Sequence, residues 1–246
     1  LLTWVSQAIL PKHVLDGQDM NTAAWNTKPT VTDGPFVFGE WVSGSYILVK
    51  KNPNYFLSEP NLDQIIYRVT PDSNALLASQ QKGEIDMRYA MTADQVQIVD
   101  KLPDWTVTRT PSHSVFHFTI NTANPLMSDK AVRQALTYAL DKTGITQSIL
   151  KGLVQPSWSP ITPASWAYNA NVTKLEYNPT KAKQLLDDAG WKVNPSTGIR
   201  EKDGKPLSFG VTNIAGDIER QQIVEIAIQQ WKAIGVQAEL KPVDAA

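Results

Sequence analysis

The chain has 246 residues, a formal net charge of -1 and no cysteine. This length suffices for one large α/β domain or two small ones, and the near-neutral charge gives no electrostatic footprint for nucleic acid or anionic lipid. A chain without cysteine forms no disulfide and no thiolate metal site. No apolar run approaches the roughly 20 residues of a membrane-spanning helix. Eight tryptophans are the one unusual count. Tryptophan suits cores, but it also suits surfaces that stack on ligands.

The first half of the chain reads as short strands with few helices. Apolar alternation and turn residues predict strands at 37–41, 46–50, 64–70, 84–87, 105–109 and 115–120. The first two should pair across a turn at Ser43-Gly44. In the last of them, Phe116, Phe118 and Ile120 share one face, because side chains alternate along a strand.

Two helices interrupt these strands. Ser73 is expected to cap the first helix, and Gly83 should end it in a left-handed conformation. Thr92 and Gln95 have the spacing of a capping box, which predicts a second helix that reaches about Lys101.

The second half is richer in helices. Ser128 is expected to cap a helix whose apolar face carries Val132, Leu136 and Leu140. Asn178, followed by proline, predicts the start of another helix.

The end of the chain predicts a β-α-β unit with a right-handed crossover. Alternating apolar residues predict strands at 207–211 and 236–240, and a long helix from Asp217 to Gly235 lies between them. Pro242 should end the second strand or mark it as an edge, because proline cannot donate to a ladder. The change from strand-rich to helix-rich sequence places a boundary near 119–124.

No residue pattern indicates catalysis or a resident metal. The motifs HExxH, GxGxxG and GxSxG and the Walker loop are absent. His113 and His117 lie in a strand pattern without an acidic neighbour, which favours ordinary sheet histidines over metal ligands. Glu84 and Asp86 point the same way on a predicted strand, and a solvated strand start is favoured over a catalytic pair. We therefore expect no catalytic residue, no metal site and no cofactor.

The segment QPSWSPITPASWA, residues 155–167, contains two tryptophans, Trp158 and Trp166. Its prolines block regular hydrogen bonding, which favours an ordered loop. The tryptophans either pack the loop onto the core or line a pocket. Pocket lining gains weight because function concentrates on loops held by rigid scaffolds.

Five motifs, taken in order, resemble one family. They are DGPF with EWVSG, LVKKNPNYF, the segment that ends in GEIDM, FTINTANPLMSDKAVRQALTYALDKTGI, and YNPTKAKQLLDDAGW. Together they resemble extracellular solute-binding proteins of family 5, the peptide-binding components of ABC importers, which have relatives that bind nickel chelates or oligosaccharides. The resemblance runs from ILPKH to GVQAEL.

The resemblance implies a partial α/β fold of the two-lobed periplasmic-binding-protein-like class (type II, cluster C), with mixed sheets flanked by helices. Residues 1–120 would form part of the first lobe and residues 121–246 the second. Phe36 and Tyr55 would be structural, and Arg133 would anchor a helix through a carboxylate partner. Family members are about twice this length, so the chain is expected to be a fragment. The carboxylate that binds the peptide α-amino group would lie beyond its end, and the chain alone is expected to fold but to bind peptide weakly or not at all.

The resemblance also implies a function without catalysis. The protein would capture a peptide outside the cytoplasmic membrane and deliver it to an ABC permease, as a monomer that is periplasmic or extracellular and anchored as a lipoprotein in its full-length form. An oligosaccharide or a nickel chelate on the same scaffold is the alternative, and a hydrolase is a remote one. No nucleic acid partner is expected. The ligand cleft is expected to be bordered by Tyr89, Met91, Asn121, Trp158 and Trp166.

Overall fold

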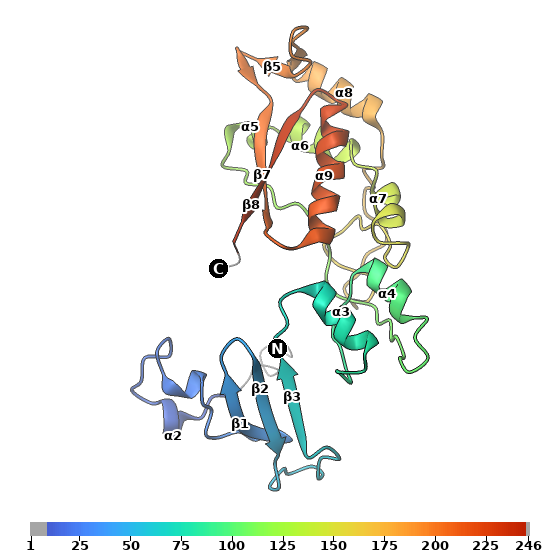
Figure 1. Ribbon diagram of the computed structural model, residues 1–246. Helices are drawn as coiled ribbons and strands as arrows, with labels where there is room; N and C mark the ends of the chain where they lie inside the picture. Colours follow the sequence, from blue (N-terminus) through green and yellow to red (C-terminus); the bar gives the residue numbers. More distant parts are fainter. Residues whose placement is uncertain (1–8, 245–246) are drawn as a thin grey trace. The chain divides into compact units, whose positions relative to one another are not determined.

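The computed structural model describes residues 9–244. The chain divides into two compact units, with the division between Asp86 and Met87. Figure 1 labels helices and strands of both units. No helix in the described part of the chain is long and apolar enough to cross a membrane.

The first unit is built on a three-stranded antiparallel sheet in the order β1-β2-β3. Its elements in chain order are α2 (Lys12–Leu15), η1 (Ala24–Asn26), β1 (Phe36–Val42), β2 (Tyr46–Lys51), β3 (Gln64–Arg68) and α3 (Ser73–Gln81). The predicted hairpin across Ser43-Gly44 is confirmed. Gly44 has a positive φ of 72°, a backbone conformation that residues other than glycine rarely adopt.

Asn52 ties together the two sequence motifs that flank the hairpin. Its side chain is 6% exposed, and its Nδ2 donates to the Gly34 carbonyl at 2.8 Å. Its backbone N–H donates to the Pro35 carbonyl at 3.0 Å, while its Oδ1 accepts from the Asn54 N–H. The GPF loop and the NPNYF turn are therefore one hydrogen-bonded structure beside the sheet.

The predicted strand at 84–87 is wrong. The Glu84 N–H bonds to the Ser79 carbonyl at 2.9 Å, and Gly83 has a φ of 70°. This pattern closes the C-terminus of α3, so the residues that follow Gly83 complete a helix cap instead of starting a ladder. The predicted left-handed Gly83 is confirmed. The cap at the other end is Asp72 and not Ser73, because the Asp72 carboxylate accepts from the Ala75 N–H at 2.7 Å.

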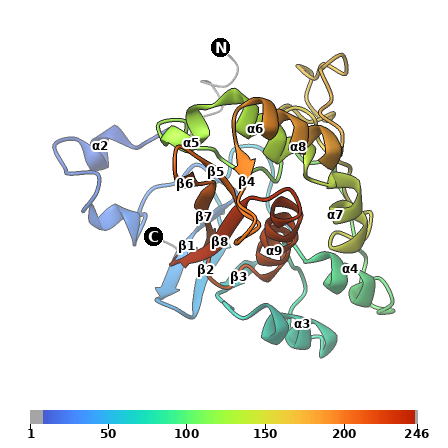
Figure 2. The same ribbon diagram turned by 90° about the horizontal axis from the view of Figure 1, so that it is seen from above.

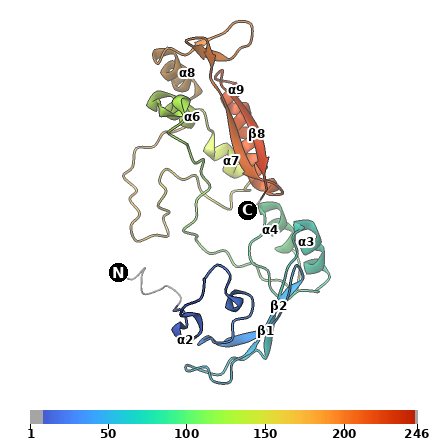
Figure 3. The same ribbon diagram turned by 90° about the vertical axis from the view of Figure 1, so that its left-hand side faces the viewer.

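The second unit contains two small sheets and most of the helices. Its elements are α4 (Ala93–Val99), α5 (Pro125–Ser128), α6 (Lys130–Tyr138), α7 (Lys142–Ser148), α8 (Pro179–Asp188), β4 (Lys192–Val193), β5 (Arg200–Lys202), β6 (Lys205–Pro206), β7 (Ser208–Ile214), α9 (Ile218–Lys232) and β8 (Gln237–Val243). Strands β7 and β8 are parallel with α9 between them in sequence, which confirms the predicted β-α-β unit. Helix α9 lies along these two strands (Figures 1 and 3).

Trp231 of α9 lies at the centre of this unit's core. Its side chain is 3% exposed, and its Nε1 donates to the Leu136 carbonyl in α6 at 3.0 Å. The rings of Phe118 and Phe209 lie 5.2 and 5.7 Å from its own, centroid to centroid. Helices α6 and α8 lie side by side over the same core (Figure 2). The predicted caps Thr92, Asn178 and Asp217 are confirmed.

The predicted strands at 105–109 and 115–120 are wrong, because neither segment pairs with a strand among residues 9–244. A strand needs a partner for its backbone groups, and a local pattern does not specify one. The alternation still determines packing in the second segment. Phe118 and Ile120 pack against the core, and Phe116 lies 5.6 Å from the Arg220 guanidinium.

Two details at element ends differ from expectation, and a third agrees with one of two alternatives. Asp129, not Ser128, caps α6, and its Oδ1 accepts from the Ala131 N–H at 2.8 Å. Arg133 does anchor its helix, but its hydrogen-bond partners are the carbonyls of Met127 and Ser128 at 2.8 and 2.9 Å, not a carboxylate. Pro242 does not end β8, which continues to Val243, but β8 pairs only with β7 in the described chain, so the alternative expectation of an edge strand is confirmed there.

The segment between residues 87 and 120 belongs to the second unit and is bonded to its helices. The Glu219 carboxylate at the start of α9 accepts from the Ala93 N–H at 3.0 Å, and Lys151 forms an ion pair with Asp94 at 3.3 Å. The compact units therefore divide earlier in the chain than the predicted boundary at 119–124. The assignment of 1–120 and 121–246 to two lobes stays a prediction.

Candidate functional site

The five predicted site residues all lie in the second unit and outside its helices and strands. Tyr89 and Trp166 are 93% and 98% exposed, Asn121 is exposed, and Met91 and Trp158 are half-buried. None of them belongs to the buried core, so their side chains remain accessible within this unit. Their place at the border of a ligand cleft stays a prediction.

Tyr89 and Met91 lie on a turn that leads into α4. Ala90, between them, has a φ of 61°, a conformation uncommon for residues other than glycine. The Ala90 carbonyl accepts from Arg88 Nε at 3.2 Å, and Arg88 Nη2 donates to Gln95 at 2.6 Å. The arginine thus joins this turn to α4 and holds it while the Tyr89 ring faces solvent.

Asn121 begins the turn before α5. Its Oδ1 accepts from the Ala123 N–H at 3.0 Å, and its backbone carbonyl accepts from the Asn124 N–H at 3.1 Å. Because the side-chain oxygen is used within the turn, its amide NH₂ group is the donor it can offer to a ligand.

Residues 155–167, which we call the tryptophan loop, belong to the long connection between α7 and α8 (Figure 3). Serine side chains form local turns, as in the bond from the Ile161 N–H to Ser159 Oγ at 3.0 Å. The buried Thr162 hydroxyl donates to the Ser112 carbonyl at 2.9 Å, which fixes the middle of the loop to a segment 50 residues away in sequence. Lys142 of α7 donates to the Ser157 carbonyl at 3.1 Å and lies 4.3 Å from the centre of the Trp158 ring.

These residues can bind a ligand through stacking and hydrogen bonds. Exposed aromatic rings bury large areas against a ligand, and an amide NH₂ donates to backbone carbonyls. In residues 9–244, no group of three or more histidine, cysteine or acidic side chains lies close enough to hold a metal ion.

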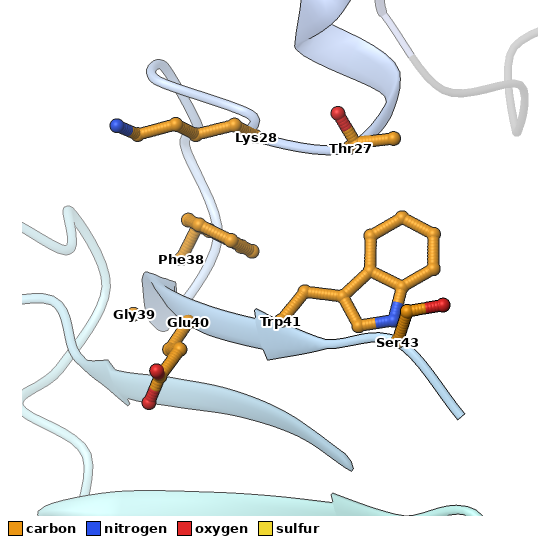
Figure 4. Close-up of a pocket in the computed structure, with 7 residues that line it drawn as sticks. All are labelled: Thr27, Lys28, Phe38, Gly39, Glu40, Trp41 and Ser43. Carbon is orange, nitrogen blue, oxygen red and sulfur yellow. The ribbon is translucent and has the colours of Figure 1, made fainter. Parts of the chain in front are cut away.

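Two pockets lie in the first unit, and the sequence reasoning did not include them. One has a volume of about 510 Å³, and the other about 760 Å³. In the smaller one, Phe38 and Trp41 extend from β1 toward Lys28 and Thr27, while Glu40 points to the other side of the strand (Figure 4).

A β-bulge explains why Phe38 and Trp41 line the same pockets. In a regular strand, Phe38 and Trp41 would point to opposite faces of the sheet. The register of β1 against β2 shifts between Phe38 and Glu40, so Gly39 is an extra residue in β1 and the two side chains point to the same face. Glycine inside an aromatic strand pattern was the signal that could have predicted it.

The chain matches known proteins over nearly its whole length. The profile of the bacterial extracellular solute-binding proteins, family 5 Middle, matches residues 4–246. The oligopeptide-binding protein AppA of Bacillus subtilis is 37% identical over 244 residues, which are 97% of this chain and 45% of AppA. Its structure in complex with a nonapeptide superposes with a TM-score of 0.86 over 97% of this chain and 48% of that one.

Two further solved structures are also similar. Lactococcal OppA, closed around an endogenous peptide, is 30% identical with a TM-score of 0.83 and covers 96% of this chain and 47% of its own. NikZ of Campylobacter jejuni, in complex with Ni(L-His), is 30% identical with a TM-score of 0.87, and the match covers 96% of this chain and 47% of NikZ. The chain therefore spans about half the length of these relatives, and the predicted fold class is confirmed for that half. The chain belongs to the bacterial extracellular solute-binding proteins of family 5.

Proposed function

We propose that the whole protein containing this chain is the substrate-binding component of an ABC importer and that its ligand is a peptide. The observation that carries the proposal is the similarity, over 97% of the chain, to a protein solved with a bound nonapeptide. A second relative of similar coverage holds an endogenous peptide. We further propose that the protein delivers the peptide to a membrane permease, and acts as a monomer outside the cytoplasmic membrane.

The proposed site gives the peptide two kinds of contact. An extended peptide offers backbone carbonyls and N–H groups at regular intervals, and the Asn121 amide would donate to one of these carbonyls. The rings of Tyr89 and Trp166 would cover apolar or aromatic side chains of the ligand, and Met91 and Trp158 would add apolar contacts. Binding of this kind breaks no bond, so we propose no catalytic activity.

A nickel chelate is the second candidate ligand, because NikZ holds Ni(L-His) and is as similar to this chain as lactococcal OppA. In the described chain no cluster of ligating side chains could hold the bare ion. An oligosaccharide would instead stack flat on an exposed tryptophan such as Trp166.

Native mass spectrometry of the full-length protein, purified without added ligand, tests the proposal. We expect the bound species to have the masses of a mixture of short peptides, which denaturation releases and fragmentation identifies. A uniform mass that corresponds to a nickel chelate or to an oligosaccharide would contradict the proposed ligand class.

A further inference from the structure

Lys142 is a half-buried ammonium without a carboxylate partner. No ion pair within residues 9–244 includes it. Its Nζ contacts the Ser157 carbonyl at 3.1 Å and the face of the Trp158 ring at 4.3 Å. Burial lowers the pKa of Lys142, as expected where a cation loses water without gaining an anion. Both of its contacts are therefore with the tryptophan loop, and both favour the charged form.

The backbone of Lys142 is fixed to the core of the second unit. Asp141 caps α7, its Oδ1 accepting from the Gly144 N–H at 2.8 Å, while the Asp141 N–H donates to Gln230 of α9 at 3.0 Å. The next turn of α7 contributes the buried side chain of Ile145. Lys142 thus extends from a rigid element to a loop that has no helix or strand of its own.

The tryptophan loop is attached to the rest of the second unit by two side-chain hydrogen bonds. Lys142 fixes its first part at Ser157, and Thr162 fixes its middle to Ser112. Its other side-chain hydrogen bonds are local turns within the loop, such as Ser157 Oγ to the Ser159 carbonyl at 2.6 Å and the Ala167 N–H to Ser165 Oγ at 3.2 Å. Local turns shape a loop but do not place it, so in the described chain these two bonds are the side-chain hydrogen bonds that tie the loop to its unit.

We propose that Lys142 is a positioning residue that holds Trp158 and the tryptophan loop in the conformation that receives the ligand. The ligand part of this inference rests on the proposed function, whereas the attachment of the loop does not. A loop that is already ordered loses less conformational entropy when a ligand binds, and so binds more tightly. Lys142 acts through Trp158 and need not touch the ligand itself.

The test compares the full-length wild-type protein with Lys142→Met and Lys142→Arg. Methionine keeps an unbranched side chain that is one atom shorter but removes the charge and the donor, whereas arginine keeps both. Lys181→Met is the matched control, because Lys181 lies 4.5 Å from the Tyr138 ring in the same kind of contact and belongs to α8, as the ring belongs to α6, not to the loop. Trp158→Leu is a second variant that removes the ring and leaves the lysine.

Hydrogen exchange of the loop amides, read by mass spectrometry without ligand, tests the attachment. We expect exchange about tenfold faster in Lys142→Met and in Trp158→Leu, because a charge-assisted hydrogen bond or its supporting contact is lost. Lys142→Arg and Lys181→Met should exchange like the wild type. Unchanged exchange in Lys142→Met would overturn the proposal.

Calorimetric titration of the same proteins with a nonapeptide tests the link to the ligand. We expect affinity about tenfold weaker in Lys142→Met, with recovery in Lys142→Arg. Equal affinity in Lys142→Met and the wild type would overturn the link. If the wild type binds no peptide, the proposed function fails, while the exchange experiment still decides whether Lys142 holds the loop.

Discussion

At the scale of single residues, Arg200 provides the clearest link between burial and stability. Its side chain is 3% exposed, and it donates to the carbonyls of Ile234 at 2.8 Å and Trp191 at 2.6 Å. It also donates to the Asp187 carboxylate at 2.7 Å. One guanidinium on β5 therefore reaches α8 through the Asp187 carboxylate and satisfies the buried carbonyls of Trp191 and Ile234, the latter just after the end of α9.

We predict that Arg200→Met lowers the free energy of unfolding by about 2–4 kcal/mol, because it leaves two buried carbonyls without donors. Urea denaturation of the full-length protein, followed by circular dichroism, measures this. Lys12→Met is the control, since the Lys12 side chain is 87% exposed and pairs only at 4.0 Å. If Arg200→Met lowers the free energy of unfolding no more than the control does, the hydrogen bonds of Arg200 do not stabilise the fold.

The ion pair of Arg200 and Asp187 predicts that the stability of the fold depends on pH. The hydrogen bond from Arg200 lowers the pKa of Asp187 from its ordinary value of 3.8. A lowered pKa in the folded state means that the stabilisation is present above pH 3.8 and is lost as the pH falls through the lowered pKa. Because the Asp187 side chain is 43% exposed, solvent screening keeps this contribution small.

Thermal unfolding of the wild type and of Asp187→Asn, from neutral pH down to about pH 3, measures this dependence. We expect the midpoint of the wild type to fall more steeply below about pH 4 than that of the variant, which has no proton to take up at this position. Parallel curves would contradict the assignment.

At the scale of elements, the sequence predicted helix starts better than strands. Thr92, Asn178 and Asp217 cap the helices that their local patterns indicated. Capping is a local interaction, and so it can be read from a few residues. The segments at 105–109 and 115–120 have strand patterns but no partner in the described chain, since pairing depends on residues far away in sequence.

The caps that were misplaced were wrong by one residue. At α6, serine and aspartate are adjacent, both types cap helices, and only the structure shows that the Asp129 carboxylate receives the bond. We predict that Asp129→Ala lowers the free energy of unfolding by about 1 kcal/mol, whereas Ser128→Ala has a smaller effect. Urea denaturation of both variants compares them directly. A larger loss of unfolding free energy in Ser128→Ala than in Asp129→Ala would show that Ser128 is the cap.

At the scale of the whole molecule, the motifs predicted the family and the fold class because their order and spacing extend along the entire chain. They did not predict how the chain divides into compact units, which depends on contacts such as that of Glu219 with the Ala93 N–H. The pockets beside β1 were not predicted either. The bulge at Gly39 breaks the alternation of side chains along β1 from which the strand was predicted. The site residues were predicted from their place after the GEIDM segment, at the presumed hinge and in the proline-rich tryptophan segment, and they remain a proposal.

Peptide binding by the whole protein is the central claim, and calorimetric titration of the full-length protein tests it most directly. The titrants are a nonapeptide, Ni(L-His) and an oligosaccharide, each added to protein stripped of endogenous ligand. We predict saturable binding of the nonapeptide at a ratio of one to one, and weaker binding in Trp166→Ala, which removes an exposed ring of the proposed site. Binding of Ni(L-His) or the oligosaccharide, with no heat from the peptide, would contradict the account.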